Sequence, residues 1–210
     1  MTAPTGHGRT TSALVLYCRS RRLPAALALL VATALLTARA GDWSTGQTRW
    51  DQGASAPAIV FAPLLASVVV GSTLPSPGDE LDRLSARAWW PRRLVHLLGL
   101  TSLAALLLAL AVPGAPGDSG APAAVRNLLG AMGLVTLATT LCGARVSWLP
   151  VSVYAVMAFT AAPHARTGGL VVWAWALQPG AASWTWLVAG ALFTAGAVLH
   201  AGRGARREGP

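Results

Sequence analysis

Six stretches of the chain are long and apolar enough to be membrane-spanning helices, and this feature limits the fold most. A helix needs about 20 apolar residues to cross the hydrocarbon core of a bilayer. Only 11% of the 210 residues are charged, whereas soluble domains have about 25%. The predicted fold class is therefore all-α, a polytopic integral membrane protein with six transmembrane helices. We expect the spans at residues 23–40, 56–74, 94–112, 123–142, 146–162 and 184–201.

Short polar and basic segments flank this transmembrane domain, which covers residues 23–201. Residues 1–22 are predicted to be a cytoplasmic tail, part of which could lie in the interface as an elbow helix. Residues 202–210 are predicted to be a basic cytoplasmic tail. Gly130 and Gly133 lie within the fourth span, where small residues allow close contact between helices.

The first forty residues also allow a second interpretation. Ala38-Arg39-Ala40 before Gly41 resembles the A-x-A cleavage site of a secretory signal. The polar leader of 22 residues is long for a signal, and the apolar run is at the upper end of signal length. Under either interpretation, the segment that follows begins outside the cytoplasm.

The arginines predict the orientation of the spans. All sixteen basic residues are arginines, and twelve of them fall in the two tails and in the connections 75–93 and 143–145. Six spans place these four segments on one side, and the arginine-rich side of a membrane protein is cytoplasmic. We therefore expect a multi-pass protein of the cell membrane with both termini in the cytoplasm. The arginines assigned to the opposite side are Arg39, Arg49, Arg126 and Arg166.

The nine tryptophans fit the same spans, because none of them falls in the middle of one. Tryptophan is enriched at the two membrane–water interfaces. The chain is thus expected to have an inner and an outer tryptophan belt. The inner belt is Trp89, Trp90 and Trp148, and the outer belt is Trp43, Trp50, Trp173, Trp175, Trp184 and Trp186.

The sequence gives little sign of chemistry. The net charge of +9 comes from arginines beside apolar segments, which is a topology signal rather than a sign of nucleic-acid binding. The chain has no lysine, so a phosphate-binding loop that ends in G-K-[ST] is excluded. Cys18 and Cys142, both predicted at the cytoplasmic side, belong to no metal-binding spacing. We expect no catalytic, cofactor-binding or metal-binding residues, and no enzyme.

The predicted spans contain no carboxylate, since all seven acidic residues fall outside them. Ion-coupled transporters usually bind protons or cations through intramembrane acidic groups, so a small secondary transporter is disfavoured. His96 and His200 lie near the inner ends of their spans. They are expected to be interfacial histidines that extend toward water, with a proton-relay role as the alternative.

Residues 76–93 are the only charge-dense connection between two spans. Ser76 and Asp79 form a capping-box pattern, Pro77 suits the first helical position, and Pro91 is expected to end the helix. The stretch therefore predicts a short amphipathic helix on the inner face of the membrane. It could be a plain solvated connection or a docking site for a partner.

The layout resembles the membrane subunit of ABC-type exporters of the ABC-2 permease class. The run ELDRLSARAWWPRRLVHLLGL resembles the same loop in membrane proteins that are encoded beside ATPases. The resemblance implies an elbow at 11–22, a coupling region at 80–90 and a broken outer segment at 163–183. It also implies a homodimer or heterodimer of permease subunits and a separate ATPase subunit that docks on residues 76–91. The candidate ATPase-facing residues are Asp79, Glu80, Asp82, Arg83 and Arg87.

The expected function is therefore that of a transmembrane permease subunit of an ATP-driven exporter. Spans rich in alanine, leucine and glycine suit hydrophobic or amphipathic cargo. The alternatives are a non-transporting membrane scaffold or accessory protein, and a small secondary transporter. Membrane lipid is an expected partner in each case.

Overall fold

The structure is a computed structural model, and every element in its described part is helical. It contains six α-helices and two short 3-10 helices, and no strand occurs in the described ranges. The predicted all-α fold is thus confirmed for these ranges. The structure describes residues 21–45, 56–75, 89–112, 120–165, 172–178 and 180–206.

Each predicted span coincides with one α-helix, and the bounds differ by a few residues at most ends. Two 3-10 helices, η1 and η2, lie on either side of α7. The elements are α2 (Leu23–Thr45), α3 (Ala56–Gly71), α5 (Trp90–Ala111), α6 (Ala121–Leu141), η1 (Ala144–Val146), α7 (Trp148–Ala165), η2 (Val172–Leu177) and α8 (Ser183–Arg203).

Two helix bounds correct the sequence-based expectation. Pro91 does not end a helix but lies in the first turn of α5, which is capped by Trp89. A proline fits there because the first turn needs no N–H donor for the helix. At the other bound, α2 continues five residues past the predicted span and so includes Asp42 near its end.

Three of these helices are long and apolar enough to cross a membrane, namely α5, α6 and α8. Shorter apolar helices cover Leu23–Arg39, Val60–Gly71 and Ala144–Ala158. Large apolar side chains also cover the outside of the bundle, and such a surface suits lipid rather than water. This composition is typical of a membrane protein. The most exposed of these side chains are Leu36, Val95, Leu110, Leu187 and Val198.

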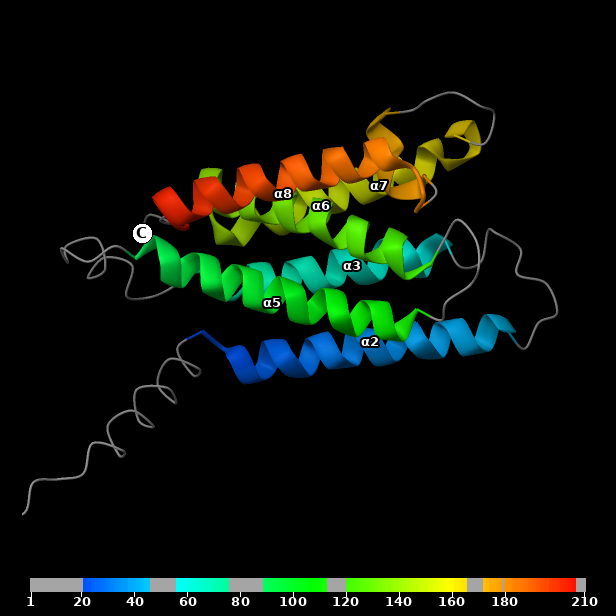
Figure 1. Cartoon of the computed structure of the whole chain (residues 1–210), viewed down its shortest axis with the longest axis horizontal. Coiled ribbons are helices and arrows are strands. Elements are labelled where there is room, and N and C mark those ends of the chain that lie inside the picture. The colour runs from blue at the N-terminus through cyan, green and yellow to red at the C-terminus, as the bar shows by residue number, and fades with distance from the viewer. Residues whose placement is uncertain are drawn as a thin grey trace, which may run out of the picture.

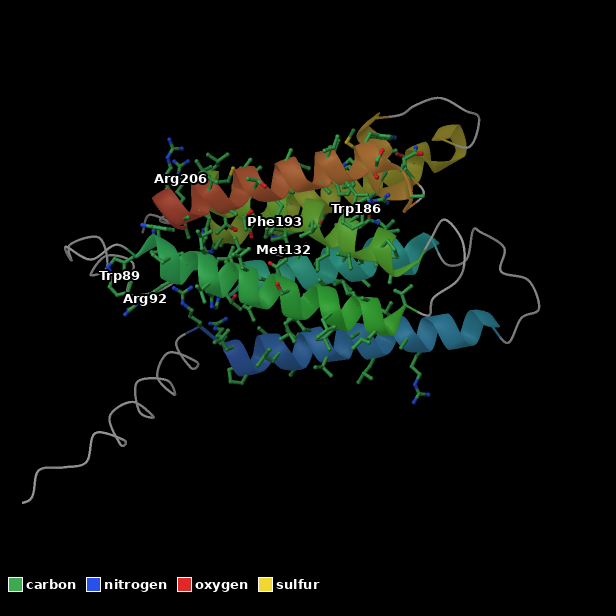
Figure 2. All side chains as sticks on the ribbon, viewed as in Figure 1. Trp89, Arg92, Met132, Trp186, Phe193 and Arg206 are labelled. Carbon is green, nitrogen blue, oxygen red and sulfur yellow. The ribbon has the colours of Figure 1, made fainter. Side chains whose placement is uncertain are left out.

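The six α-helices lie side by side, and each runs opposite to the one before it (Figure 1). Helix α6 is central and packs most extensively against α8 and α3, whereas α2 lies at the edge against α3 and α5. Helices α2, α5 and α7 begin at the same side of the bundle at which α3, α6 and α8 finish. We call this side the basic end, and the opposite side the far end. On α8, Trp186 lies toward the far end and Arg206 follows at the basic end (Figure 2).

The centre of the bundle is packed by apolar side chains and by glycine contacts. Met132 of α6 is fully buried, and Phe193 of α8 packs against the same cluster (Figure 2). A Cβ on Gly133 would lie 2.6 Å from the backbone nitrogen of Phe193. The expected close helix contact at Gly133 is therefore confirmed, and it joins α6 to α8.

Candidate functional site

The basic end holds most of the arginines that the structure describes. Of the nine arginines in the described ranges, seven lie there and two, Arg39 and Arg126, lie toward the far end. This unequal distribution gives the bundle two chemically different ends. The arginines of the basic end are Arg21, Arg22, Arg92, Arg93, Arg145, Arg203 and Arg206.

Two of these arginines hold the ends of helices. Arg21 Nη1 donates to the carbonyl oxygens of Thr73 and Leu74, both at 3.3 Å, just after α3 ends. Arg206 Nη1 donates to the carbonyl oxygen of Leu141 at 2.6 Å, at the end of α6. The last carbonyls of a helix have no hydrogen-bond partner within the helix. A cation there also interacts favourably with the negative end of the helix dipole. These contacts fix the ends of α3 and α6 to neighbouring segments.

The two histidines near this end face the interior, so the prediction that they extend toward water is wrong. His96 is 9% exposed and His200 is 2% exposed. His96 Nε2 lies 3.0 Å from Thr73 Oγ1, which joins the first turns of α5 to the end of α3. The histidines point inward because α5 and α8 turn these faces toward the rest of the bundle.

Toward the far end, Arg126 is completely buried, with 0% of its surface exposed. It is the sixth residue of α6. Nε and Nη2 donate to Asn127 Oδ1 at 3.2 and 3.0 Å, and Nη1 donates to Thr185 Oγ1 at 3.0 Å. Nη2 also donates to the carbonyl oxygens of Ala176 at 3.2 Å and Gln178 at 2.9 Å. One guanidinium thus connects α6, α8 and the η2 segment.

The η2 segment is also held by α6 and α7. Asn127 Nδ2 donates to the carbonyl oxygen of Ala176 at 2.9 Å, and the Ala176 N–H donates to the Tyr154 hydroxyl at 3.1 Å. The Trp175 indole stacks on the Tyr154 ring, with 5.3 Å between centroids. Side chains from α6 and α7 therefore satisfy the backbone of a short segment that has no long helix of its own. We call Arg126, Asn127, Tyr154, Ala176 and Thr185 the Arg126 cluster.

Trp175 lies inside the bundle, so its assignment to the outer tryptophan belt is wrong. It is 4% exposed, and its six-membered ring lies against Gly130 of α6. Gly130 is nine residues into α6, which places the ring about 13 Å along that helix. The expected close contact at Gly130 is confirmed, although its partner is a connecting segment rather than a helix. Residues 172–178 therefore insert between α6, α7 and α8.

Sequence reasoning missed this cluster. It assigned Arg126 to the arginines outside the membrane, although the residue falls within the predicted span at 123–142. A charged side chain inside an apolar helix usually faces the bundle and marks a functional site, and the pair Arg126-Asn127 was the signal that could have identified it. The five predicted docking residues, Asp79, Glu80, Asp82, Arg83 and Arg87, lie outside the described residues, as does the elbow predicted at 11–22 except for its last two residues.

The Arg126 cluster is suited to positioning the η2 segment, since Arg126 donates to two backbone carbonyls, an amide oxygen and a hydroxyl group. Within the described ranges, no group of three or more His, Cys, Asp or Glu side chains could hold a metal ion. Comparisons with protein-family models, with curated proteins and with solved structures found no match for the chain.

Proposed function

We propose that the chain is a multi-pass protein of the cell membrane with six spans and both termini in the cytoplasm. The six α-helices alternate in direction, so the start of α2 and the end of α8 lie at the same end. Arginine-rich ends of membrane proteins face the cytoplasm, and the basic end holds seven of the nine described arginines. In this orientation the far end, with the Arg126 cluster, faces outward.

Within this orientation, we propose that the chain is the transmembrane permease subunit of an ATP-driven exporter. The observation that carries the proposal is the way the start of α5 joins its neighbours. His96 is bonded to Thr73 after α3, and a Cβ on Gly204 after α8 would lie 2.9 Å from the Arg93 guanidinium. A movement of the connection 76–88, which leads into α5, would therefore reach α3 and α8 as well.

The segment before α8 gives separate support. ABC-2 permeases, whose layout the chain resembles, have a broken outer segment before the last span. Here η2 occupies that position in the chain, and it inserts between the helices toward the far end. The exporter proposal therefore rests on one feature at each end of the bundle.

In the proposed mechanism, a separate ATPase subunit docks on residues 76–91 and moves them as it hydrolyses ATP. Two permease subunits, identical or different, would form the transport path between them. Their helices are rich in alanine and leucine and expose apolar side chains, which suits a hydrophobic or amphipathic cargo. The chain itself needs no catalytic residue for this role.

The proposal is tested by purifying the tagged protein from its native host in mild detergent. We expect an ATPase in stoichiometric amounts, and we expect it to be lost when Glu80→Arg and Asp82→Arg are combined. The matched control combines Asp51→Arg and Asp118→Arg, which change the charge equally in connections predicted to lie outside. The control should retain the ATPase.

Other results would favour other functions. If the protein is recovered alone or with partners that are not ATPases, the exporter proposal is wrong and a membrane scaffold is favoured. A scaffold should also tolerate the charge reversal at Glu80 and Asp82. If vesicles that contain the protein take up substrate in response to an ion gradient without ATP, it is a secondary transporter.

A further inference from the structure

Two exposed arginines and two tryptophans lie where α2 and α5 begin, at the basic end. Arg22 directly precedes α2, and Arg92 lies in the first turn of α5 with Trp89 and Trp90 beside it. Helices α2 and α5 pack against each other, so the four residues belong to one side of the bundle. We call this set the α2–α5 rim. Figure 2 shows Trp89 and Arg92 together at this end of the molecule.

The rim combines two exposed arginines with two tryptophans, and Arg145, Arg203 and Arg206 at the basic end are exposed as well. Arg21 and Arg206 donate to the carbonyls that follow α3 and end α6, and Arg93 is buried against Gly204. Arg22 and Arg92 are both exposed. The rim thus presents the positive charge of Arg22 and Arg92, which take no part in these contacts with the ends of α3, α6 and α8.

Arg92 lies over the ring of Trp89. Its guanidinium carbon lies 4.7 Å from the centroid of the Trp89 ring. A cation at this distance is attracted to the face of the ring, and the guanidinium carries five N–H donors. This planar fork matches two oxygens of a phosphate group. Trp89 therefore lies beside an exposed guanidinium whose donors suit a phosphate.

Trp90 indicates the depth at which that phosphate would lie. Its side chain is 55% exposed and lies at the end of an apolar helix. Exposed tryptophans at the ends of membrane helices lie at the level of the lipid head groups. The arginines beside Trp90 would then meet lipid phosphates rather than solutes of the cytoplasm.

We propose that the α2–α5 rim binds the head groups of anionic phospholipids in the inner leaflet. The proposal rests on the membrane orientation proposed above, but not on an exporter function. Net charge favours an anionic lipid over a zwitterionic one, because the chain carries +9 overall. The neighbouring connection 76–88 reduces this charge little, since its three acidic residues are partly balanced by two arginines. Basic residues near a membrane surface add to the attraction of anionic lipid.

The test uses the purified full-length chain in an uncharged detergent, with bound lipid measured by native mass spectrometry during titration. The probes are phosphatidylglycerol, phosphatidylcholine and inorganic phosphate. We expect phosphatidylglycerol to bind well below the concentration at which phosphatidylcholine binds. Combining Arg22→Gln with Arg92→Gln should weaken the binding of phosphatidylglycerol about 30-fold, or about fivefold for each arginine.

The control is Arg39→Gln, which removes an exposed arginine toward the far end and should leave lipid binding unchanged. Replacing Arg22 and Arg92 by lysine keeps the charge and should restore most of the affinity. Equal binding of the two lipids, or unchanged binding by the glutamine variant, would overturn the proposal. Competition by inorganic phosphate at the lipid's own concentration would also overturn it, because the site would then bind a small anion.

Discussion

The indole of Trp175 lies so close to Gly130 that a Cβ on the glycine would be 2.6 Å from the ring carbon Cζ2. The Trp175 ring also stacks on Tyr154 of α7, with an interplanar angle of 17°. The η2 segment is thus held by ring packing on α6 and α7, in addition to the hydrogen bonds of Arg126 and Asn127. This arrangement requires a residue without a side chain at position 130.

Replacing Gly130 by alanine should therefore destabilise the protein. The added methyl group would overlap the Trp175 ring, and overpacking of this kind costs about 1–3 kcal/mol. Gly99→Ala is the matched control, since a Cβ there meets nothing within 4 Å and alanine favours a helix by up to about 1 kcal/mol. Thermal unfolding in detergent should show a lower midpoint for Gly130→Ala and an equal or higher one for Gly99→Ala. Equal midpoints for the two variants would show that Trp175 is not packed against Gly130.

Replacing Arg126 by leucine should loosen the η2 segment. The change removes hydrogen bonds to Thr185 Oγ1 and to the carbonyls of Ala176 and Gln178. Hydrogen bonds to charged groups contribute about 1.5–3 kcal/mol each in water-soluble proteins, and unpaired buried carbonyls add a penalty. We expect a loss of at least about 3 kcal/mol in the free energy of unfolding. The measurement is thermal unfolding together with protease cleavage between α7 and α8.

Two further variants sharpen the Arg126 experiment. Arg126→Lys should rescue little, because an ammonium group cannot reproduce the planar fork that reaches four acceptors. Arg39→Leu changes an exposed arginine and should alter stability by less than about 0.5 kcal/mol. If Arg126→Leu were as stable as Arg39→Leu, the buried guanidinium would not be what holds η2 in place.

The helices could be predicted from the sequence because their signal is local. An apolar run of about 20 residues indicates a span wherever it occurs, and all six predicted ranges coincide with helices. The ends of the helices were harder to predict, because a proline such as Pro91 can either follow the last turn of a helix or lie in its first turn. Successive spans must cross in opposite directions. The direction of each helix therefore follows from its position in the order of the spans.

The Arg126 cluster could not be predicted in the same way. Arg126 and Ala176 are fifty residues apart, and no local pattern shows that a short connection returns to satisfy a buried guanidinium. Trp175 was assigned to the membrane surface because it lies in the connection 163–183, whose apolar stretch is too short to cross a membrane. The indole of Trp175 fits inside the bundle because Gly130 of α6 has no side chain to occupy that space. The docking role of Asp79, Glu80 and Asp82 stays a prediction.

The contact between α6 and α8 gives a second packing experiment. A Cβ on Gly196 would lie 2.9 Å from the carbonyl oxygen of Gly133, so the two backbones meet there directly. Gly196→Leu should separate the helices and cost more than the overpacking of a single methyl group, more than about 3 kcal/mol. Gly190→Leu, on the same helix, replaces a glycine whose Cβ would meet nothing within 4 Å. It should leave the thermal midpoint nearly unchanged; equal losses for both would place the contact elsewhere on α8.

Cysteine labelling tests the proposed orientation. Cys142 is exposed just after α6, at the basic end, so it should be cytoplasmic. In a Cys18→Ser parent, a membrane-impermeant maleimide should label Cys142 only after the cells are permeabilised. With both native cysteines replaced by serine, Ser119→Cys in the connection before α6 should label in intact cells, which controls for reagent access. Labelling of Cys142 in intact cells would reverse the orientation, since it would place the arginine-rich end outside. The docking of a cytoplasmic ATPase at residues 76–91 would then be excluded, because that connection leads into the same end of the bundle.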